Sequence, residues 1–199
     1  MANPNSLKLE LVTSEDIPAL IDLWFRVFTD PSMQHLFPDT PGVCEWWTDA
    51  NRHDLVHKPF QRYLKIIDPD SIDDQGRPRM VAYAKWDLGS LDVRGSRFPP
   101  WHEDMPGRDC EQFFGRLDSE RRVIMGERKH FYLDMLGTDP AYRRCGAASM
   151  LLRWGCDLAD QEETAAYVDA SRDGAPLYGK FGFVDRTVSA GGTASMVRE

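Results

Sequence analysis

A strand followed at once by a turn, two arginines, a glycine and a helix is the feature that most constrains how this chain can fold. The segment "HFYLDMLGT", residues 130–138, is rich in aliphatic and aromatic residues and predicts a strand. Pro140 marks a turn after it, and residues 147–160 carry apolar side chains at helical spacing. An ordinary connecting loop requires neither the two arginines nor the small residues that open this helix.

The start of that helix is suited to bind an anion. Its first N–H groups have no acceptor within the helix, and the helix dipole adds about half a positive charge there. Small residues let a bulky phosphate approach the backbone, and arginines add charge-assisted hydrogen bonds. The residues concerned are Arg143, Arg144, Gly146, Ala147, Ala148 and Ser149. We favour a pyrophosphate as the anion, although these residues alone leave an ordinary helix end with solvated arginines equally open.

The rest of the sequence predicts a mixture of helices and strands. Residues 7–11 alternate apolar and polar side chains as a strand does, and capping residues open an amphipathic helix over 13–28. Prolines interrupt residues 31–42, which we interpret as a loop. Further helices are predicted over 43–57, 111–128 and 175–182, further strands over 62–68, 79–88 and 165–170, and a final hairpin over 183–198.

Residues 89–110 form a long stretch without periodicity. The stretch is rich in proline and glycine, and ordered loops of this length are usually lids or binding loops. Together with the helix that follows, it forms an insertion-like segment over 89–128. With 199 residues, of which 42% are apolar, the chain is long enough for one sizeable core, so we expect a single domain over 1–199.

Charge and apolar patterning exclude several classes of partner. The chain has 24 Lys and Arg against 32 Asp and Glu, which gives a formal net charge of −8. This charge opposes binding to nucleic acid and to anionic membranes. No apolar run approaches the roughly 20 residues of a membrane span, and the first residues lack the pattern of a secretory signal. We therefore expect a cytoplasmic protein with neither a nucleic-acid nor a membrane partner.

The cysteines and histidines form no metal-binding pattern. Cys44, Cys110, Cys145 and Cys156 show no C-x-x-C spacing, and we expect reduced thiols that are mostly buried. The histidines outside residues 130–138 are scattered through helices and loops without the spacing of metal ligands. We therefore expect no metal in the site.

Two motifs of this sequence resemble, in their order along the chain, motifs of the GNAT acyltransferase superfamily, which transfers acyl groups from acyl-CoA, usually to amines. The family motif Gln/Arg-x-x-Gly-x-Gly/Ala has its counterpart in "RRCGAA", residues 143–148, after the typical turn "TDPAYR". The later motif LY-x-K-x-GF has its counterpart in "LYGKFGF", residues 177–183. The resemblance is clearest over residues 129–185, and the stretch 111–160 is similar to members from filamentous fungi. It implies an α/β (α+β) fold whose mixed, mostly antiparallel sheet is splayed at the CoA-binding strand and flanked by helices.

The resemblance also implies that acetyl-CoA is the acyl donor and that the turn after the strand holds its pyrophosphate. Backbone amides of residues 143–149 would make these contacts. Cys145 departs from the family pattern, in which Lys, Arg or Gly is common at this place. Because the implied contact is made by the backbone, binding should survive the departure. Ala148 in place of a glycine is within the range of the family.

Two further contacts with CoA are implied by the resemblance. The strand end at Leu136, Gly137 and Thr138 would hydrogen-bond the pantetheine arm as an added strand does, and a backbone N–H near Leu136 would meet the thioester oxygen. Ser171 occupies a place where family members often have Asn or Ser against the CoA arm. A turn-capping role for Ser171 is an equal alternative.

Acyl transfer to an amine requires a neutral amine, and the leaving thiolate benefits from a proton. Tyr178 lies where the family often places the tyrosine that protonates or hydrogen-bonds the CoA sulfur, the alternative being a half-buried aromatic residue with its hydroxyl at the surface. Strand alternation places Asp134, Leu136 and Thr138 on one face unless a bulge intervenes. Family members often carry a general base on this face, and Asp134 is our candidate. A salt bridge at Asp134, or an ordered water in place of a base, remains an alternative.

We therefore predict an N-acetyltransferase in which the acceptor amine attacks directly in a ternary complex, because no cysteine is placed to form an acyl-enzyme. The acceptor is a small molecule or a peptide. The family walls its acceptor pocket with the first two helices and the loop before the CoA strand, which makes Trp24, Phe28 and Trp101 candidates for that wall. A non-catalytic domain that binds or senses acyl-CoA, and transfer to a hydroxyl group, are the competing readings.

Overall fold

A mixed sheet organises the part of the chain that the computed structural model describes, residues 6–189 and 192–199. Seven strands within these residues form it in the order β1-β2-β3-β4-β5-β7-β6. The strands are β1 (Lys8–Leu11), β2 (Gln61–Ile72), β3 (Pro78–Asp87), β4 (His130–Thr138), β5 (Ala165–Ser171), β6 (Val184–Asp185) and β7 (Thr193–Arg198). Only β4 and β5 are parallel neighbours, and the other neighbouring pairs are antiparallel. The predicted mixed, mostly antiparallel sheet is confirmed.

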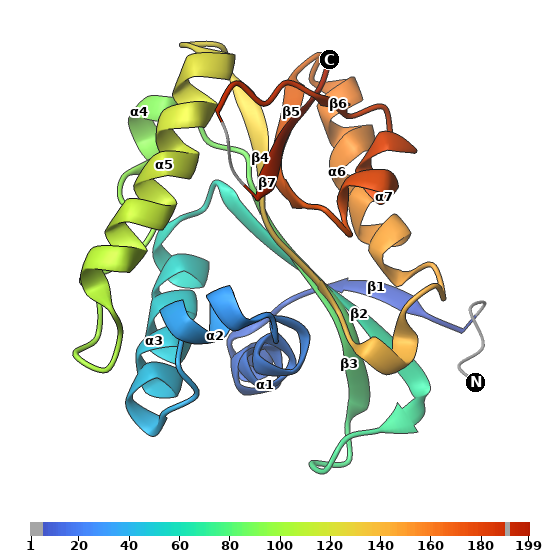
Figure 1. The fold of residues 1–199 in the computed structure, drawn as a ribbon. Helices are drawn as coiled ribbons and strands as arrows, with labels where there is room; N and C mark the ends of the chain where they lie inside the picture. The colour runs from blue at the N-terminus through green and yellow to red at the C-terminus, as the bar shows by residue number, and fades with distance from the viewer. Residues whose placement is uncertain (1–5, 190–191) are drawn as a thin grey trace.

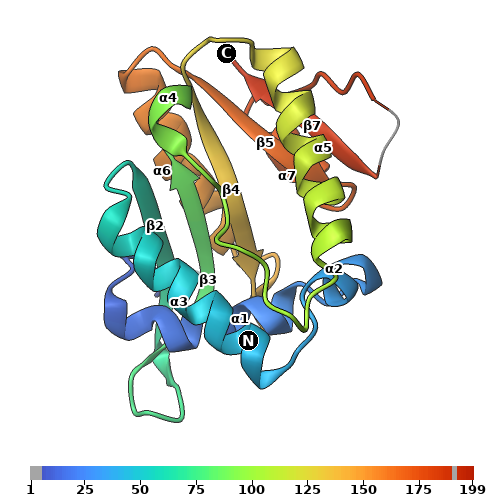
Figure 2. The same cartoon turned by 90° about the vertical axis from the view of Figure 1, so that its left-hand side faces the viewer.

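Helices cover both faces of this sheet, as Figure 1 shows. One face carries α6 (Ala147–Gln161) and α7 (Ala175–Gly179), and the other carries α1 (Ile17–Val27), α2 (Pro31–Leu36), α3 (Pro41–His57) and α5 (Gly107–Met125). Figure 2 shows α3 and α5 in front of the strands, with α4 (Leu91–Arg94) near the top. Two 3-10 turns, η1 (Ser14–Asp16) and η2 (Pro140–Tyr142), precede α1 and α6. No helix in the part of the chain described here is long and apolar enough to cross a membrane.

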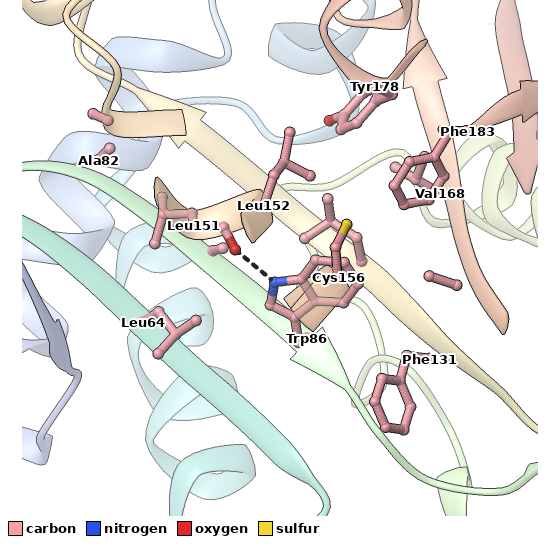
Figure 3. Packing of buried hydrophobic residues seen from close by; sticks show 14 of the residues in the cluster. Leu64, Ala82, Trp86, Phe131, Leu151, Leu152, Cys156, Val168, Tyr178 and Phe183 are labelled. Atoms are coloured by element: carbon pink, nitrogen blue, oxygen red, sulfur yellow. Dashed lines mark hydrogen bonds between the residues drawn. The ribbon is translucent and has the colours of Figure 1, made fainter. Parts of the chain in front are cut away.

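Each face of the sheet buries its own apolar core. On the α6 face, the Trp86 indole Nε1 donates a hydrogen bond to the carbonyl oxygen of Leu151 over 3.4 Å (Figure 3). Gly155 of α6 permits this approach, because a Cβ atom at that position would lie 2.2 Å from the indole ring. On the opposite face, Trp24 and Trp47 are fully buried with ring centroids 6.1 Å apart. Close aromatic packing therefore holds helices against both sides of the sheet.

β4 and β5 separate part-way along their length. Their parallel register ends at Leu133 and Val168. Beyond that point β4 continues to pair with β3 as far as Thr138, and β5 continues to pair with β7 as far as Ser171. The sheet therefore opens between the carboxyl ends of β4 and β5, and the splay expected from the sequence is confirmed.

A bulge in β4 changes the direction of its side chains at the point where the strands separate. Successive residues of β3 pair with Leu133 and Met135, so Asp134 is an extra residue in the ladder. Leu133 accordingly packs into the core on the α6 face and Met135 into the opposite core. The shared face expected for Asp134, Leu136 and the strand end beyond depended on there being no bulge, and this bulge separates Asp134 from Leu136. Leu136 packs against the α6-face core, because the bulge reverses the alternation.

The first correction to the predicted elements concerns residues 31–42. These residues were expected to form a loop, but they contain α2 and the beginning of α3. Pro31 occupies the first turn of α2, where a backbone N–H would have no acceptor within the helix, so its absence costs no hydrogen bond. The Asp30 side chain caps the helix by accepting a hydrogen bond from the Met33 N–H over 3.1 Å. Proline therefore marks a helix start here, and the prolines were misread as helix breakers.

The second correction concerns residues 89–128. The stretch predicted as an aperiodic loop over 89–110 contains α4 and the first turn of α5. The helix predicted over 111–128 begins at Gly107 and ends at Met125, after which Gly126 adopts a positive φ of 56°. The final hairpin is formed by β6 and β7, in which Val184 pairs with Val197 and Asp185 with Met196. Residues 190–191, between these strands, lie outside the described residues.

Candidate active site

A cavity of about 440 Å³ lies where β4 and β5 separate. Side chains of both apolar cores line it, so the cavity reaches both faces of the sheet. They include Leu133, Val168 and Tyr178 from the α6 face and Trp24, Phe37 and Phe114 from the other face. A molecule held in this cavity would therefore contact side chains from both sides of the sheet.

Four residues singled out from the sequence line this cavity together. They are Asp134 and Leu136 of β4, Ser171 of β5 and Tyr178 of α7. Trp24 and Phe28, expected near an acceptor, also belong to the lining. Trp101 does not, and stacks instead on Phe114 with ring centroids 5.8 Å apart. Three separate elements, β4, β5 and α7, thus bring their predicted residues to one place.

Tyr178 reaches the cavity because α7 begins close to the end of β5. Gly174 allows this approach, since a Cβ atom there would lie 3.0 Å from the Tyr178 ring and 3.2 Å from Ser171 Oγ. Burial raises the pKa of Tyr178, so its hydroxyl keeps its proton at neutral pH. Ser171 Oγ accepts a hydrogen bond from the Gly174 N–H over 3.1 Å, which is the turn-capping alternative considered for this serine.

Asp134 is ion-paired on the α3 side of the sheet. Its carboxylate lies 3.2 Å from Lys85 Nζ and 2.5 Å from Arg97 Nη2, and its side chain is only 3% exposed. Lys85 Nζ also donates to Asp54 Oδ2 over 2.8 Å. Burial by itself would raise the pKa of Asp134, but the cations of Arg97 and Lys85 outweigh burial and lower this pKa to about 2. The salt-bridge alternative is therefore the arrangement that the structure shows.

Asp169 of β5 is a further carboxylate in the cavity lining that the sequence interpretation did not single out. Its Oδ2 accepts a hydrogen bond from the Tyr132 hydroxyl over 3.0 Å, and its Oδ1 accepts one from the Tyr167 hydroxyl over 2.9 Å. Burial raises the pKa of Asp169 more than the tyrosines and Arg97 lower it. The signal that could have identified it is a charged residue in the otherwise apolar strand "AAYVDA", two positions before Ser171.

The turn between β4 and α6 exposes the backbone that was expected to bind a pyrophosphate. Arg144 and Gly146 adopt positive φ values of 64° and 88°, and the first hydrogen bond of α6 joins the Met150 N–H to the Gly146 oxygen over 3.0 Å. The N–H groups of residues 147–149 precede that bond. A Cβ atom at Gly146 would meet no described atom within 4 Å, and Arg143 and Arg144 are exposed. The turn thus offers donors, open space and positive charge together.

Contacts with three other elements hold this turn in place. The Tyr142 hydroxyl donates to Asp68 Oδ2 of β2 over 2.9 Å. Asp139 pairs with Arg26 of α1 over 3.3 Å, and its N–H donates to the Val81 oxygen of β3 over 2.8 Å. The backbone expected to bind an anion is therefore held in place by contacts within the chain, which would limit the entropy that binding costs.

The end of β4 offers a free backbone edge to the cavity side. Residues 135–138 pair with β3, but among the described strands none pairs with their other edge, since the register with β5 stops at Leu133. Gly137 is closely covered by α1, because a Cβ atom there would lie 3.2 Å from Tyr83 and 3.3 Å from Val27. An extended ligand arm along Leu136, Gly137 and Thr138 would add to this edge as a short strand.

Comparison with known proteins places these features in a known fold. Residues 99–183 match the acetyltransferase (GNAT) family. A structure described as histone acetyltransferase HPA2 and related acetyltransferase, from Corynebacterium glutamicum, has 21% identity and a TM-score of 0.59 over 97% of this chain and 96% of that chain. The PaiA N-acetyltransferase from Thermoplasma acidophilum, in complex with coenzyme A, has 11% identity and a TM-score of 0.56 over 98% and 99%. No curated protein matches the chain significantly.

A third solved structure, an acetyltransferase from Trypanosoma brucei, has 16% identity and a TM-score of 0.55 over 93% of this chain and 97% of that chain. At these identities the solved structures establish a shared fold, which is the GNAT-like fold that the two sequence motifs implied. The residues that match the family run from before α5 to the end of "LYGKFGF", so they include β4, the turn, α6, β5 and α7. The narrower resemblance to members from filamentous fungi stays a prediction.

Proposed function

Residues 99–183 match the acetyltransferase (GNAT) family, and from this match we propose that the chain is an acetyl-CoA-dependent N-acetyltransferase. The observation that carries the proposal is the cavity at the separation of β4 and β5, which both faces of the sheet line. An acyl donor that enters from the α6 and α7 side and an amine that enters from the α1, α2 and α5 side would meet there. Direct transfer in a ternary complex requires such a meeting point.

The residues present fit acetyl-CoA as the donor. Residues 143–149 would hold its pyrophosphate through Arg143, Arg144 and the backbone N–H groups that surround the open space at Gly146. Leu136, Gly137 and Thr138 would bond its extended arm along the free edge of β4, and Ser171 lies across the cavity from them. When bound, acetyl-CoA supplies a thioester carbonyl carbon that an amine can attack. The N-acetyltransferase from Thermoplasma acidophilum, which shares this fold, was solved with coenzyme A.

Tyr178 is the proposed proton donor. Tyr178 lines the cavity, and burial keeps its hydroxyl protonated at neutral pH. A phenol that donates a proton or a hydrogen bond to a developing thiolate makes that thiolate a better leaving group. None of the four free cysteines contributes to the described lining of the cavity, which supports direct attack over an acyl-enzyme.

Asp134 stays a prediction as general base. A carboxyl group whose pKa is lowered to about 2 by two cations is a weak proton acceptor at neutral pH. Its contacts instead suit a structural role, because it compensates two buried cations at the bulge of β4. The proposed transfer does not depend on Asp134 as the base.

Two measurements on the purified protein test the proposed function. Acetyl-CoA should raise the melting temperature by mass action, because it binds the folded chain. A panel of amines, with peptides that carry free amino groups, should then release CoA thiol from acetyl-CoA faster than buffer does. Stabilisation by acetyl-CoA without thiol release from any amine would point to a non-catalytic binding domain. Thiol release with alcohols but not amines would point to an O-acyltransferase, and no stabilisation at millimolar acetyl-CoA would refute the proposal.

A further inference from the structure

Among the described residues, three carboxylates line the cavity, and they differ in the groups that already contact them. Asp134 is ion-paired to Lys85 and Arg97. Asp30 lies at the exposed beginning of α2, where it caps the helix. Asp169 is half-buried and receives hydrogen bonds only from neutral hydroxyl groups. Among the residues described, no cation forms an ion pair with Asp169. It is therefore the carboxylate of the inner cavity that is left to compensate a charge on a ligand.

We propose that Asp169 binds the ammonium group of the acceptor and receives its proton, and that the acceptor carries this group on an apolar body. This inference rests on the proposed N-acetyltransferase function and names the acceptor class and the base for it. Asp169 lines the same cavity as Tyr178 and Leu136, so an amine docked on its carboxylate lies in the space where the acyl group would be transferred.

The environment of Asp169 holds the carboxylate in one orientation. Tyr132 of β4 and Tyr167 of β5 each donate to a different oxygen, over 3.0 Å and 2.9 Å. A carboxylate oxygen has more than one acceptor site, so each can accept a further N–H bond. The cations that face this region are Arg97, which precedes α5, and Arg121 of α5, both of which lie over the Tyr132 ring. Burial outweighs these partners and raises the pKa of Asp169, which suits a proton acceptor.

The opposite wall of the cavity is apolar and aromatic. Its side chains include Trp24, Phe28, Phe113, Phe114 and Leu117. A second hollow of about 360 Å³ lies between α2 and α5 and shares Ser32, Phe113 and Arg116 with the cavity. The hollow extends the cavity outward between these helices, with Phe113 as the aromatic side chain that both share. An acceptor whose body is apolar would bury that body against the wall while its ammonium group reaches Asp169.

The proton balance of the proposed step is complete with the residues present. An Asp169 oxygen takes one proton from the ammonium group and leaves a neutral amine, whose lone pair forms the new C–N bond. The C–S bond breaks with its electron pair on sulfur, and Tyr178 gives its phenolic proton to that sulfur. The nitrogen loses a second proton to solvent as the amide forms, while Tyr178 takes one back from solvent. Asp169 returns its own proton to solvent, so the net reaction releases one proton.

The test compares Asp169→Asn with the parent, using acetyl-CoA with phenethylamine and with glucosamine. Phenethylamine should have the higher kcat/KM in the parent, because its ammonium group sits on an apolar body. Asp169→Asn should lower kcat/KM for phenethylamine by about 100-fold or more and remove the low-pH limb of the rate profile. The rise in melting temperature with acetyl-CoA should persist. Asp157→Asn, which removes the same charge from the exposed face of α6, is the matched control and should behave as the parent.

A second variant keeps the test decisive if Asp169→Asn folds poorly. Tyr167→Phe removes one donor from the carboxylate without altering the described cavity lining. The pKa of Asp169 should then rise further, and the low-pH limb should move to higher pH. Turnover in the parent with unchanged rates and profiles in both variants would overturn the role of Asp169 alone. A preference for glucosamine would overturn the apolar acceptor, and absence of thiol release in the parent would overturn both this inference and the proposed function.

Discussion

The guanidinium group of Arg97 lies 2.5 Å from the carboxylate of Asp134 and ties the segment between β3 and α5 to the bulge of β4. The same guanidinium group lies 4.9 Å from the centroid of the Phe114 ring and 5.5 Å from that of Tyr132. Arg94 of α4 anchors the segment a second time through Asp87 over 2.9 Å. The stretch that the sequence suggested as a lid or binding loop is thus attached to the sheet through Arg94 and Arg97.

Replacing Asp134 with Asn should destabilise the protein strongly. The substitution leaves Lys85 and Arg97 with too little compensating charge in a buried place, and breaking such a pair typically costs about 3–5 kcal/mol. Urea unfolding of parent and variant measures this loss. The low-pH limb of the rate profile should be unchanged in the variant. A variant of normal stability that has lost this limb would instead identify Asp134 as the base.

Replacing Gly146 with Val should abolish stabilisation by CoA while the fold persists. The side chain fills the open space at the turn, and a positive φ of 88° strains any residue with a branched Cβ by about 1–3 kcal/mol. Gly76→Val is the matched control, because Gly76 has a φ of 75° and open space around it in the turn between β2 and β3. Melting curves with and without CoA distinguish the two variants. Equal responses to CoA would contradict the anion site.

Replacing Tyr178 with Phe should slow thiol release without weakening CoA binding. Loss of a general acid typically lowers kcat by about 100-fold or more, and the ring that packs at 5.9 Å from Phe183 is retained. Tyr83→Phe provides the control, because the buried Tyr83 hydroxyl has no hydrogen-bond partner and the residue is not part of the cavity lining described. Steady-state rates of thiol release by both variants test this role. A Tyr178→Phe variant as fast as Tyr83→Phe would show that Tyr178 is not the proton donor.

The stability of the protein should fall as pH drops from about 6.5 to 4 because of His130. Arg94 Nη1 donates to His130 Nε2 over 2.9 Å, so this nitrogen must accept and the ring must be neutral. Burial, together with nearby arginines, lowers the pKa of His130 to about 4. The unfolded chain, with a pKa near 6.5, therefore takes up the proton first as the pH falls, which removes up to about 3 kcal/mol of stability.

Urea unfolding at pH 7, 5.5 and 4.5 measures this dependence on His130. A His130→Gln variant should lose most of the slope between these values, whereas His53→Gln, at an exposed position of α3, should keep it. A parent whose unfolding free energy is constant from pH 7 to 4.5 would show that His130 is not held neutral in this way.

Much of the architecture followed from local patterns, because those patterns act over a few residues. The alternation in β1, the helical spacing of α1 and α6 and the turn after β4 all lie where the sequence predicted them. Proline was misread at residues 31–42, since the same missing N–H that breaks a helix interior is harmless in its first turn. The boundary of α5 was misplaced because glycine at its start carries no helical signal.

The sequence by itself indicated the family that this chain resembles and the turn that carries its candidate anion site, since both depend on contiguous residues. Only the tertiary structure decided which carboxylates share the cavity and what state each is in. The bulge in β4 places Asp134 beside two cations, Lys85 of β3 and Arg97 of the segment before α5. Asp169 lines the cavity because β5 diverges from β4. Contacts between residues that are distant in sequence set burial and charge, and these two quantities govern proton affinity.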